Sequence, residues 1–545
     1  MNPAPHPRRL LLVAVLCALA FAASTLFSRA LKAPDEVRVA EIGREMAVTG
    51  DWVTPRLDGD PFLEQPPLAY AAVALARRTF GSSDAVARLP SCLAAIAALL
   101  LAFGIARRLG GGEAGLLAVL VLASLTGFQR YATACLVDGP LMLAITLGQA
   151  AWLALLEPSP REGGAARSHA GAVLLLHVAA GLAFLVKGAV GPALLYGPLL
   201  VDLNWHRRWS LMRSGWHLAG LAFALALVAA WPLALAGSAP HLLAQYWNES
   251  VLGRLLPGHF PEGGHHNPVT FYFVSFPGMV APWLLAAPAL VVWLRRAPPG
   301  DVARRPGTRA LASLFPVGLL LLTIPSTRRS LYLLPLVPSV AVTCALWLAS
   351  TRRRAARSRI ETLTLLLLAA PFALLAELPA RALGALRGTR PDPFGVRPLL
   401  ASLRRGAPAA AGAGGTAPRL AWTLFAVAIA ANLLAGRIAE AEDDMTPMAT
   451  GLARLGAVGD GLLGFRLDER TRAIVPLRTG ELFENVRDPA ALAARLAAHP
   501  DARVLHVTQN RDHFPAELLS QLRPVARWNF GRHEYELLER VDASD

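Results

Sequence analysis

Residues 34–67 read PDEVRVAEIGREMAVTGDWVTPRLDGDPFLEQPP, and they follow directly on an apolar run at residues 9–29. An apolar run of about 20 residues is long enough to cross a bilayer as a helix. The stretch behind this run places carboxylates where the chain leaves the membrane. Ionisable groups at the end of a span are less costly than at its middle, yet they remain candidates for function. We therefore expect chemistry in residues 34–67.

The rest of the chain is also apolar. Of its 545 residues 54% are hydrophobic and only 17% are charged, which is typical of a membrane protein rather than of a soluble domain. We predict an all-α polytopic membrane protein with about 11–13 transmembrane helices. Beyond the first run, the predicted spans lie near residues 86–106, 113–127, 135–156, 170–186, 188–203, 216–236, 271–294, 308–324, 331–349, 360–378 and 418–436.

The charge of the chain follows the membrane pattern. Its net charge is +15, but the arginines gather in alternate loops between spans, which indicates cytoplasmic loops and excludes a nucleic-acid-binding face. Arg8 and Arg9 precede the first run as they would in a signal peptide, but the run is too long, so we expect a retained helix. With these arginines inside, the outer segments are residues 30–85, 128–135, the neighbourhood of Lys187, 237–270 and 325–330.

The first outer loop, residues 30–85, has the composition of a structured segment. Residues 36–48 are compatible with a helix that Gly50 ends, and Pro66 and Pro67 precede a second helix that reaches Phe80. We expect both to be interfacial helices rather than spans.

The composition changes near residue 438, where short apolar runs alternate with a helical pattern. We predict a transmembrane domain over residues 1–437 and a small soluble α/β domain over 438–545 on the outer face. Residues 380–418 are rich in arginine, which favours the cytoplasm, so we expect a hairpin or two short helices over about 360–385. Residues 406–415 have the composition of a flexible linker.

Three acids stand at the predicted outer surface. Asp35 and Glu36 begin the helix after the first span, and Asp138 opens the apolar run of YATACLVDGPLML at a matching depth. Acids at a helix start also cap it and complement its dipole, so each has a structural interpretation. A partly desolvated carboxylate can instead act as a general base. Glu64, in FLEQPP, is a fourth acid, and as a candidate it is weak by itself.

Cations lie in the same outer segments. Lys187 interrupts an apolar stretch, Arg328 is followed by Tyr332 between two spans, and Arg38 and Arg254 lie on outer segments. Arginine and lysine donors of this kind would bind a phosphate at the bilayer surface. The alternative is that they extend towards lipid headgroups.

Other cofactor signals are weak. The four cysteines show no paired spacing, and His259, His265 and His266 with Glu262 match no metal-ligand spacing. A divalent ion held by Asp35 and Asp138 stays possible, and no other cofactor is required. The chain has neither a P-loop nor a G-x-G-x-x-G signature, so a lipid-borne donor fits better than a cytosolic nucleotide.

Six segments carry a resemblance to a known family over roughly residues 5–350. Together they resemble the GT-C membrane glycosyltransferases, specifically glycosyltransferase family 39 and its relative, 4-amino-4-deoxy-L-arabinose lipid A transferase, and the protein mannosyltransferases. The segments are PDEVRVAEIGREMAVTGDWVTPRLDG, FLEQPPLAYAAVAL, ARLPS, YATACLVDGPLML, GLAFLVKGAVGP and STRRSLYLLPLVPSVA. Two positions depart from the aminoarabinose group: Gln65 stands where lysine is usual, and Val39 where tyrosine is common.

The resemblance implies a sugar transfer from a polyprenyl-phosphate carrier to lipid A, a glycan or a protein on the outer face of a bacterial inner membrane, generally with inversion. Asp35 would be the catalytic carboxylate, Glu36 its acidic neighbour and Asp138 the second acid, which would orient Asp35, bind sugar or help to hold an ion. The candidates for binding the donor are Arg38, Glu64, Lys187, Arg254, Arg328 and Tyr332.

Two functions from other classes compete with this one. A lipid or sugar transporter or flippase would carry charges near the membrane midplane, whereas these acids and most of the cations lie at one boundary. An envelope assembly protein that binds through its terminal domain would not need Asp35. Within the transferases, the sequence leaves the sugar and the acceptor open.

Overall fold

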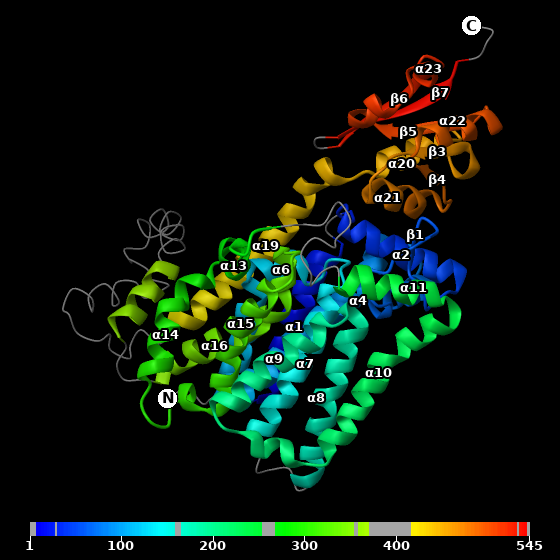
Figure 1. The fold of residues 1–545 in the computed structure, drawn as a ribbon. Coiled ribbons are helices and arrows are strands. Elements are labelled where there is room, and N and C mark those ends of the chain that lie inside the picture. Colours follow the sequence, from blue (N-terminus) through cyan, green and yellow to red (C-terminus); the bar gives the residue numbers. More distant parts are fainter. Residues whose placement is uncertain are drawn as a thin grey trace, which may run out of the picture. The chain divides into compact units, whose positions relative to one another are not determined.

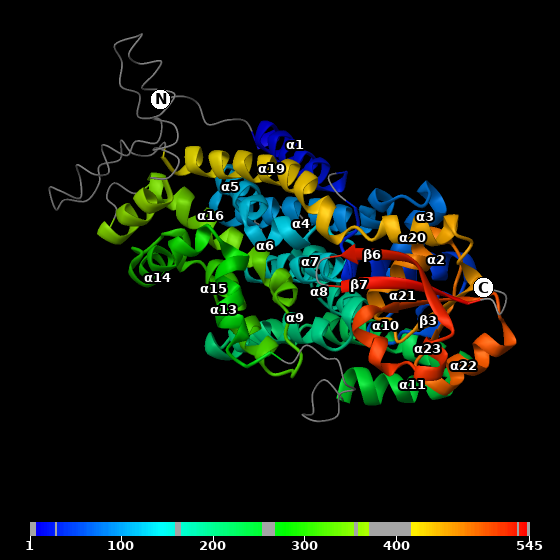
Figure 2. The ribbon, with the colours of Figure 1, turned by 90° about the horizontal axis from the view of Figure 1, so that it is seen from above.

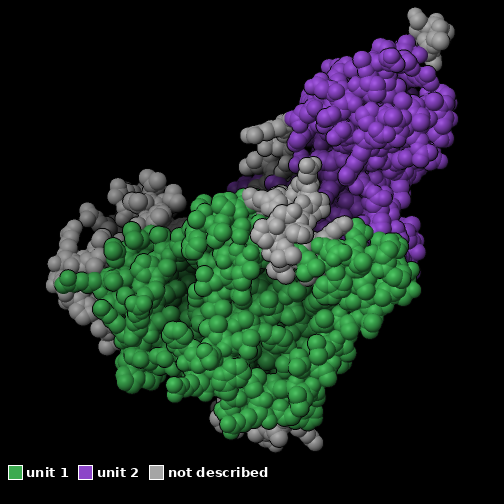
Figure 3. Space-filling view, viewed as in Figure 1, with its two compact units in different colours: residues 1–26, 91–134, 138–433 green, residues 27–90, 135–137, 434–545 purple. Residues whose placement is uncertain are grey.

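The computed structural model describes residues 7–27, 30–157, 165–252, 267–353, 358–369, 416–530 and 533–541. The chain divides into two compact units (Figure 3). Unit 1 comprises residues 1–26, 91–134 and 138–433, and unit 2 comprises residues 27–90, 135–137 and 434–545. Arg254, the three histidines at 259, 265 and 266, and the segments 370–400 and 401–415 lie outside the described residues.

Unit 1 is built of helices, and each predicted apolar run is mostly helical where it is described. Its long helices are α1 (Pro7–Leu26), α4 (Asp84–Gly110, in this unit from residue 91), α5 (Gly112–Ser124), α7 (Asp138–Leu156), α8 (Ala165–Lys187), α9 (Val190–Trp205), α10 (Trp216–Ser238), α13 (Phe271–Val280), α14 (Ala287–Arg296), α15 (Pro306–Thr323), α16 (Val337–Arg353) and α19 (Thr416–Asp443). Short helices connect them: α6 (Thr126–Tyr131), η1 (Trp209–Arg213), α11 (Pro240–Gln245), η2 (Tyr246–Leu252), η3 (Trp283–Ala286), η4 (Val302–Arg304) and η5 (Ser330–Leu336).

Fewer helices than predicted have the length of a span. Among the described residues, seven helices are long and apolar enough to cross a membrane, or eight if the pair at Phe271–Val280 and Trp283–Arg296, bent by 99°, is one broken span. The prediction of 11–13 spans counted every apolar run, but α5 has only 13 residues and α9 only 16. A multi-pass membrane protein remains the architecture.

The helices of unit 1 pack closely around α7, α8 and α16. α8 packs against both α7 and α10 along its length (Figure 1). α19 meets α1 where the Asn432 amide donates to the Ser24 hydroxyl at 3.4 Å, and the two helices are seen beside one another in Figure 2. Because α7 and α8 pack against one another, the residues Asp138 on α7 and Lys187 on α8 can come together.

The loop at residues 30–85, in unit 2, has the two predicted helices. α2 (Asp35–Thr49) ends at Gly50, whose φ of 72° is a left-handed conformation that glycine adopts without strain. α3 (Leu68–Phe80) follows Pro66 and Pro67, and the two helices pack on one another. A short hairpin of β1 (Arg56–Leu57) and β2 (Asp60–Pro61) lies between them in the chain.

The last hundred residues of unit 2 contain the predicted α/β fold. A five-stranded mixed sheet has the order β4-β3-β5-β7-β6, in which β3 is parallel to β4 and β5 while β7 is antiparallel to β5 and β6. A core of Phe465, Leu492, Val504 and Leu538 lies between this sheet and its helices. The elements are α20 (Thr446–Arg454), η7 (Gly459–Gly461), β3 (Leu462–Phe465), α21 (Glu469–Thr479), β4 (Glu484–Val486), α22 (Pro489–Ala498), β5 (Arg503–Val507), η8 (Thr508–His513), α23 (Ala516–Leu519), β6 (Leu522–Phe530) and β7 (His533–Arg540).

Candidate functional site

Asp138 and Lys187 form a buried ion pair in unit 1. Asp138 is the first residue of α7 and Lys187 the last residue of α8, and they are 1% and 7% exposed. The Lys187 ammonium donates to the Asp138 carboxylate. Each charge has the sign that its helix end favours, because a helix is positive at its N-terminus and negative at its C-terminus. The structure therefore places together one predicted acid and one predicted cation.

Tyr332, from η5, completes this group. Its ring centroid lies 4.0 Å from the Lys187 ammonium nitrogen. A cation over an aromatic face is attracted by the electron-rich ring, and more strongly when both are shielded from water. Three of the predicted residues thus belong to one cluster, Asp138, Lys187 and Tyr332, which we call the lysine cluster.

Arg328 is bound mainly to backbone oxygens. Its guanidinium donates to the carbonyls of Asn267 at 2.6 Å and of Thr323, the last residue of α15, at 2.7 Å, and the Asn267 amide donates back to the Arg328 carbonyl at 2.8 Å. A cation at a helix C-terminus satisfies carbonyls that lack a partner within the helix. Through these hydrogen bonds Arg328 connects the loop before η5 to Asn267 and to the end of α15.

Tyr272 was not singled out from the sequence. It lies on α13, is fully buried, and its phenol interacts electrostatically with Tyr332, Arg328 and Asp138. The segment FYFVSF offers no signal for it, because an aromatic residue in an apolar helix is usually part of the core or faces lipid. Its hydroxyl adds a possible donor beside the lysine cluster.

In unit 2, Asp35 is paired with Arg38 one helical turn later. The Arg38 guanidinium donates to the Asp35 carboxylate at 3.1 Å, and the two side chains are 16% and 19% exposed. Burial alone would lower the pKa of Arg38, but the charges of Glu64, Glu469 and Asp35 outweigh burial and raise it. Arg38 is therefore a permanent cation, surrounded by three carboxylates.

Glu36 points away from this group and is fully engaged by other donors. Its carboxylate accepts from Arg88 at 2.8 and 3.0 Å, from the Lys32 amide at 2.9 Å and from the Cys135 amide at 2.9 Å, and it is 3% exposed. Arg88 also donates to the Ala30 carbonyl at 2.7 Å. Multiple hydrogen bonds compensate the cost of burying a charge. Glu36 thus holds the start of α2, although we predicted it beside the catalytic acid.

The predicted residues therefore fall into two groups, each described within its own unit. Unit 1 holds the lysine cluster with Arg328 near it, and unit 2 holds Asp35 with Arg38 and Glu64. Arg254 lies outside the described residues. No group of three or more histidine, cysteine or acidic side chains that could hold a metal ion occurs among the residues described.

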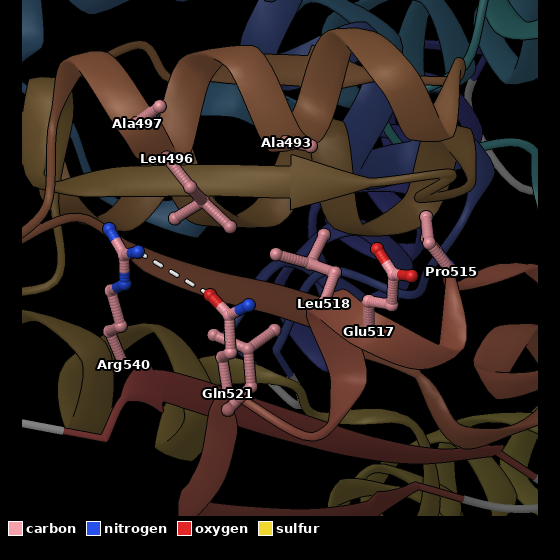
Figure 4. A pocket seen from close by; sticks show the side chains of 9 residues that line it. Ala493, Leu496, Ala497, Pro515, Glu517, Leu518, Gln521 and Arg540 are labelled. Carbon is pink, nitrogen blue, oxygen red and sulfur yellow. Dashed lines mark hydrogen bonds between the residues drawn. The ribbon is translucent and has the colours of Figure 1, made fainter. Parts of the chain in front are cut away.

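A shallow pocket in the terminal α/β fold has a different character (Figure 4). It has a volume of about 190 Å³, and α22, α23 and β6 contribute most of its apolar lining. Arg540 donates to the Gln521 side chain at 3.4 Å at its edge. None of the residues predicted as functional lines it.

Comparison with known proteins gives a consistent result. A family model described as dolichyl-phosphate-mannose-protein mannosyltransferase matches residues 8–244. The undecaprenyl phosphate-α-4-amino-4-deoxy-L-arabinose arabinosyl transferase of Edwardsiella ictaluri is 30% identical over 58% of this chain and 55% of its own length. The Pseudomonas aeruginosa protein of the same name is 32% identical over 50% of this chain and 48% of its own length. The chain thus matches about half the length of these curated relatives.

Two solved structures share the fold. The crystal structure of ArnT from Cupriavidus metallidurans bound to undecaprenyl phosphate is 20% identical, with a TM-score of 0.70 over 98% of both chains. The oligosaccharyltransferase AglB from Archaeoglobus fulgidus, solved with an inhibitory peptide and a dolichol-phosphate, is 11% identical, with a TM-score of 0.53 over 93% of this chain and 70% of its own. The chain therefore has the fold of the GT-C membrane glycosyltransferases, and in sequence it resembles their aminoarabinose transferases and protein mannosyltransferases.

Proposed function

We propose that this protein is a membrane glycosyltransferase that moves a sugar from a polyprenyl-phosphate carrier to an envelope acceptor. The observation that carries the proposal is the fold match over 98% of both chains to a transferase solved with undecaprenyl phosphate. The sequence match to aminoarabinose transferases favours lipid A as the acceptor and an aminopentose as the sugar.

In unit 2, we propose Asp35 as the general base. It takes the proton of the acceptor hydroxyl while the acceptor oxygen attacks the anomeric carbon. Its 19% exposed side chain is reachable from outside the fold, unlike that of Glu36. Arg38 orients the Asp35 carboxylate, and the Glu36–Arg88 pair fixes the helix start on which Asp35 stands.

In unit 1, we propose that Lys187 binds the lipid phosphate. The bond from the anomeric carbon to the phosphate oxygen breaks, and the phosphate leaves with the electron pair. Phosphate needs no proton to leave, so a cation is sufficient to stabilise the developing charge. Asp138 holds the Lys187 ammonium in place, and Tyr332 shields it from water.

For the location, we propose the bacterial inner membrane, with the site open to the periplasm. Arg8 and Arg9 at the start of α1 favour a cytoplasmic N-terminus, and Asp35 then follows a single span. This topology gives access to a lipid-borne donor and to an acceptor outside the cytoplasm.

The test is a transfer assay with the purified full-length protein in detergent. Polyprenyl-phosphate sugars labelled in the sugar are supplied with lipid A, glycan or protein acceptors, and Asp35→Asn is compared with wild type. Loss of general-base catalysis lowers the rate by about 10²–10⁴-fold. Asp460→Asn is the matched control, because Asp460 is an exposed acid of the same unit.

Transfer by wild type and by Asp460→Asn, with little transfer by Asp35→Asn, is the expected result. If wild type transfers no sugar from any of these carriers, the proposed activity is wrong. If Asp35→Asn transfers as fast as wild type, the activity stands and Asp35 is not its base.

A further inference from the structure

Arg38 lies between two carboxylates that come from distant parts of the chain. Its Nη2 donates to Asp35 at 3.1 Å, and its Nη1 donates to Glu469 at 2.5 Å. Glu469 is the first residue of α21 in the terminal α/β fold, directly after Asp468, whose side chain caps the helix by accepting from the Thr471 amide. A residue of the terminal fold thus reaches the arginine that orients the proposed base.

The helix that carries Glu469 is fixed along its length within unit 2. Arg472, one turn later, donates to Asp58 at 3.2 Å and to Asp60 at 2.6 Å in the loop hairpin. Arg478, at its other end, donates to both oxygens of Asp84 at 2.6 and 2.9 Å. Paired arginine–carboxylate contacts define orientation as well as distance. The position of Glu469 beside Arg38 is therefore set by its helix, α21, which the contacts of Arg472 and Arg478 hold in place.

Four titratable side chains, from several segments of unit 2, act on Arg38. Asp35 stands on its own helix, Glu64 precedes α3, Tyr70 lies on α3, and Glu469 comes from α21. The Phe62 ring lies 5.4 Å from the guanidinium carbon. Because the guanidinium divides its donors between Asp35 and Glu469, only one of its nitrogens is committed to Asp35.

We propose that Glu469 is a positioning residue for the transfer reaction: it draws Arg38 away from a two-point grip on Asp35 and so leaves the Asp35 carboxylate able to accept a proton. This inference rests on the proposed function, in which Asp35 is the base. It assigns to the terminal α/β fold a role in catalysis beyond shaping the acceptor site.

Loss of the Glu469 charge has a defined consequence. With Gln at this position, Arg38 turns both of its donor nitrogens to Asp35 in the bidentate geometry that arginine and carboxylate prefer. The carboxylate is then held as a stable ion and is a weaker base. The step that suffers is proton transfer, whereas binding of the lipid donor is unaffected.

The experiment compares Glu469→Gln with Glu484→Gln in the full-length protein. Glu484 is a matched control, since its side chain is 48% exposed against 47% for Glu469, and it pairs with Arg495 at 3.0 Å within the terminal fold. The readouts are kcat, KM for the lipid-linked donor, the pH profile of kcat and the thermal unfolding midpoint. Glu469→Asp retains the charge and serves as the rescue variant.

We expect Glu469→Gln to lower kcat by about 10- to 100-fold, part of what general-base catalysis contributes, because the base is weakened rather than removed, with KM unchanged. The acid limb of its pH profile shifts to lower pH, Glu469→Asp restores the limb, and Glu484→Gln matches wild type. An inactive wild type refutes the proposed function itself. An active wild type with Glu469→Gln equal to Glu484→Gln refutes only this inference. A loss of kcat with no shift of the acid limb and a lowered unfolding midpoint also refutes it, because the contact is then structural.

Discussion

Lys187 and Asp138 meet inside unit 1 although they stand 49 positions apart, one at the end of α8 and the other at the start of α7. Neither charge could be buried alone, because the cost of removing an ion from water exceeds most single contributions to stability. Each charge therefore compensates the cost of burying the other. The pair also shows how an ammonium can be kept in an apolar helix bundle.

We predict that Lys187→Met lowers the free energy of unfolding by about 3–5 kcal/mol, since it leaves the Asp138 carboxylate buried without its counterion. The double variant Asp138→Asn with Lys187→Met should recover part of this loss, because both charges are then gone. Neither variant should transfer sugar, as both lack the ammonium. Denaturation in detergent and the transfer assay measure the two effects. A single variant as stable as wild type, or a double variant with full transfer, would contradict the assignment.

The Glu36–Arg88 pair gives a second prediction. Arg88→Met should cost about 3–5 kcal/mol of stability, because Glu36 loses the buried guanidinium that is paired with its carboxylate. The control is Arg495→Met, which breaks the exposed pair with Glu484, and exposed pairs contribute only about 0–1 kcal/mol. Comparable unfolding midpoints for the two variants would show that the Glu36–Arg88 pair is not needed for stability.

Much of the local structure could be predicted because it depends on neighbours in the sequence. The apolar runs gave the helices of unit 1, and Gly50 marked the end of α2 because a left-handed residue there favours glycine. Outer acids and cations were also recognisable, since charges at the ends of apolar runs are rare. Asp138 and Lys187 were selected in this way, whereas Tyr332 was selected through the resemblance to the family.

The partners of these charges could not be predicted, because they depend on packing between distant segments. Glu36 was placed with Asp35 on sequence adjacency, yet successive helix residues point about 100° apart, and Glu36 meets Arg88 instead. Glu469 gave no signal, since a glutamate at a helix start is ordinary. Arg328 was predicted to bind phosphate, and nothing in the sequence indicated that its two terminal nitrogens donate to the carbonyls of Asn267 and Thr323.

The turn between α8 and α9 gives a third prediction. A Cβ at Gly191 would collide with the Ala183 carbonyl oxygen, which is backbone and cannot turn aside. Gly191→Ala should therefore shift the turn that carries Lys187 and lower kcat/KM by about 10-fold or more. Gly171→Ala, in helix α8 with nothing within 4 Å of its Cβ, is the control and should retain activity. Equal activity in both variants would mean that the turn absorbs the collision.

The final prediction concerns pH and the terminal fold. His506 is fully buried on β5, its Nδ1 lies 2.9 Å from the Val507 carbonyl oxygen, and its Nε2 lies 3.3 Å from Glu536. Burial lowers the pKa of His506 below its ordinary value of 6.5, and the opposing effects of Val507 and Glu536 do not restore it. The folded protein therefore keeps this imidazole neutral at a pH where the unfolded chain already binds a proton.

The sign of the effect follows from the protons bound in each state. Stability from His506 is present above the unfolded pKa of 6.5 and is lost as pH falls towards the lower folded pKa. The unfolding midpoint of the full-length protein should thus fall between about pH 7 and pH 5, and less steeply for His506→Gln. His513→Gln, at an exposed histidine of the same fold, should follow wild type. If His506→Gln and His513→Gln lose stability equally on acidification, protonation of His506 is not what destabilises the terminal fold.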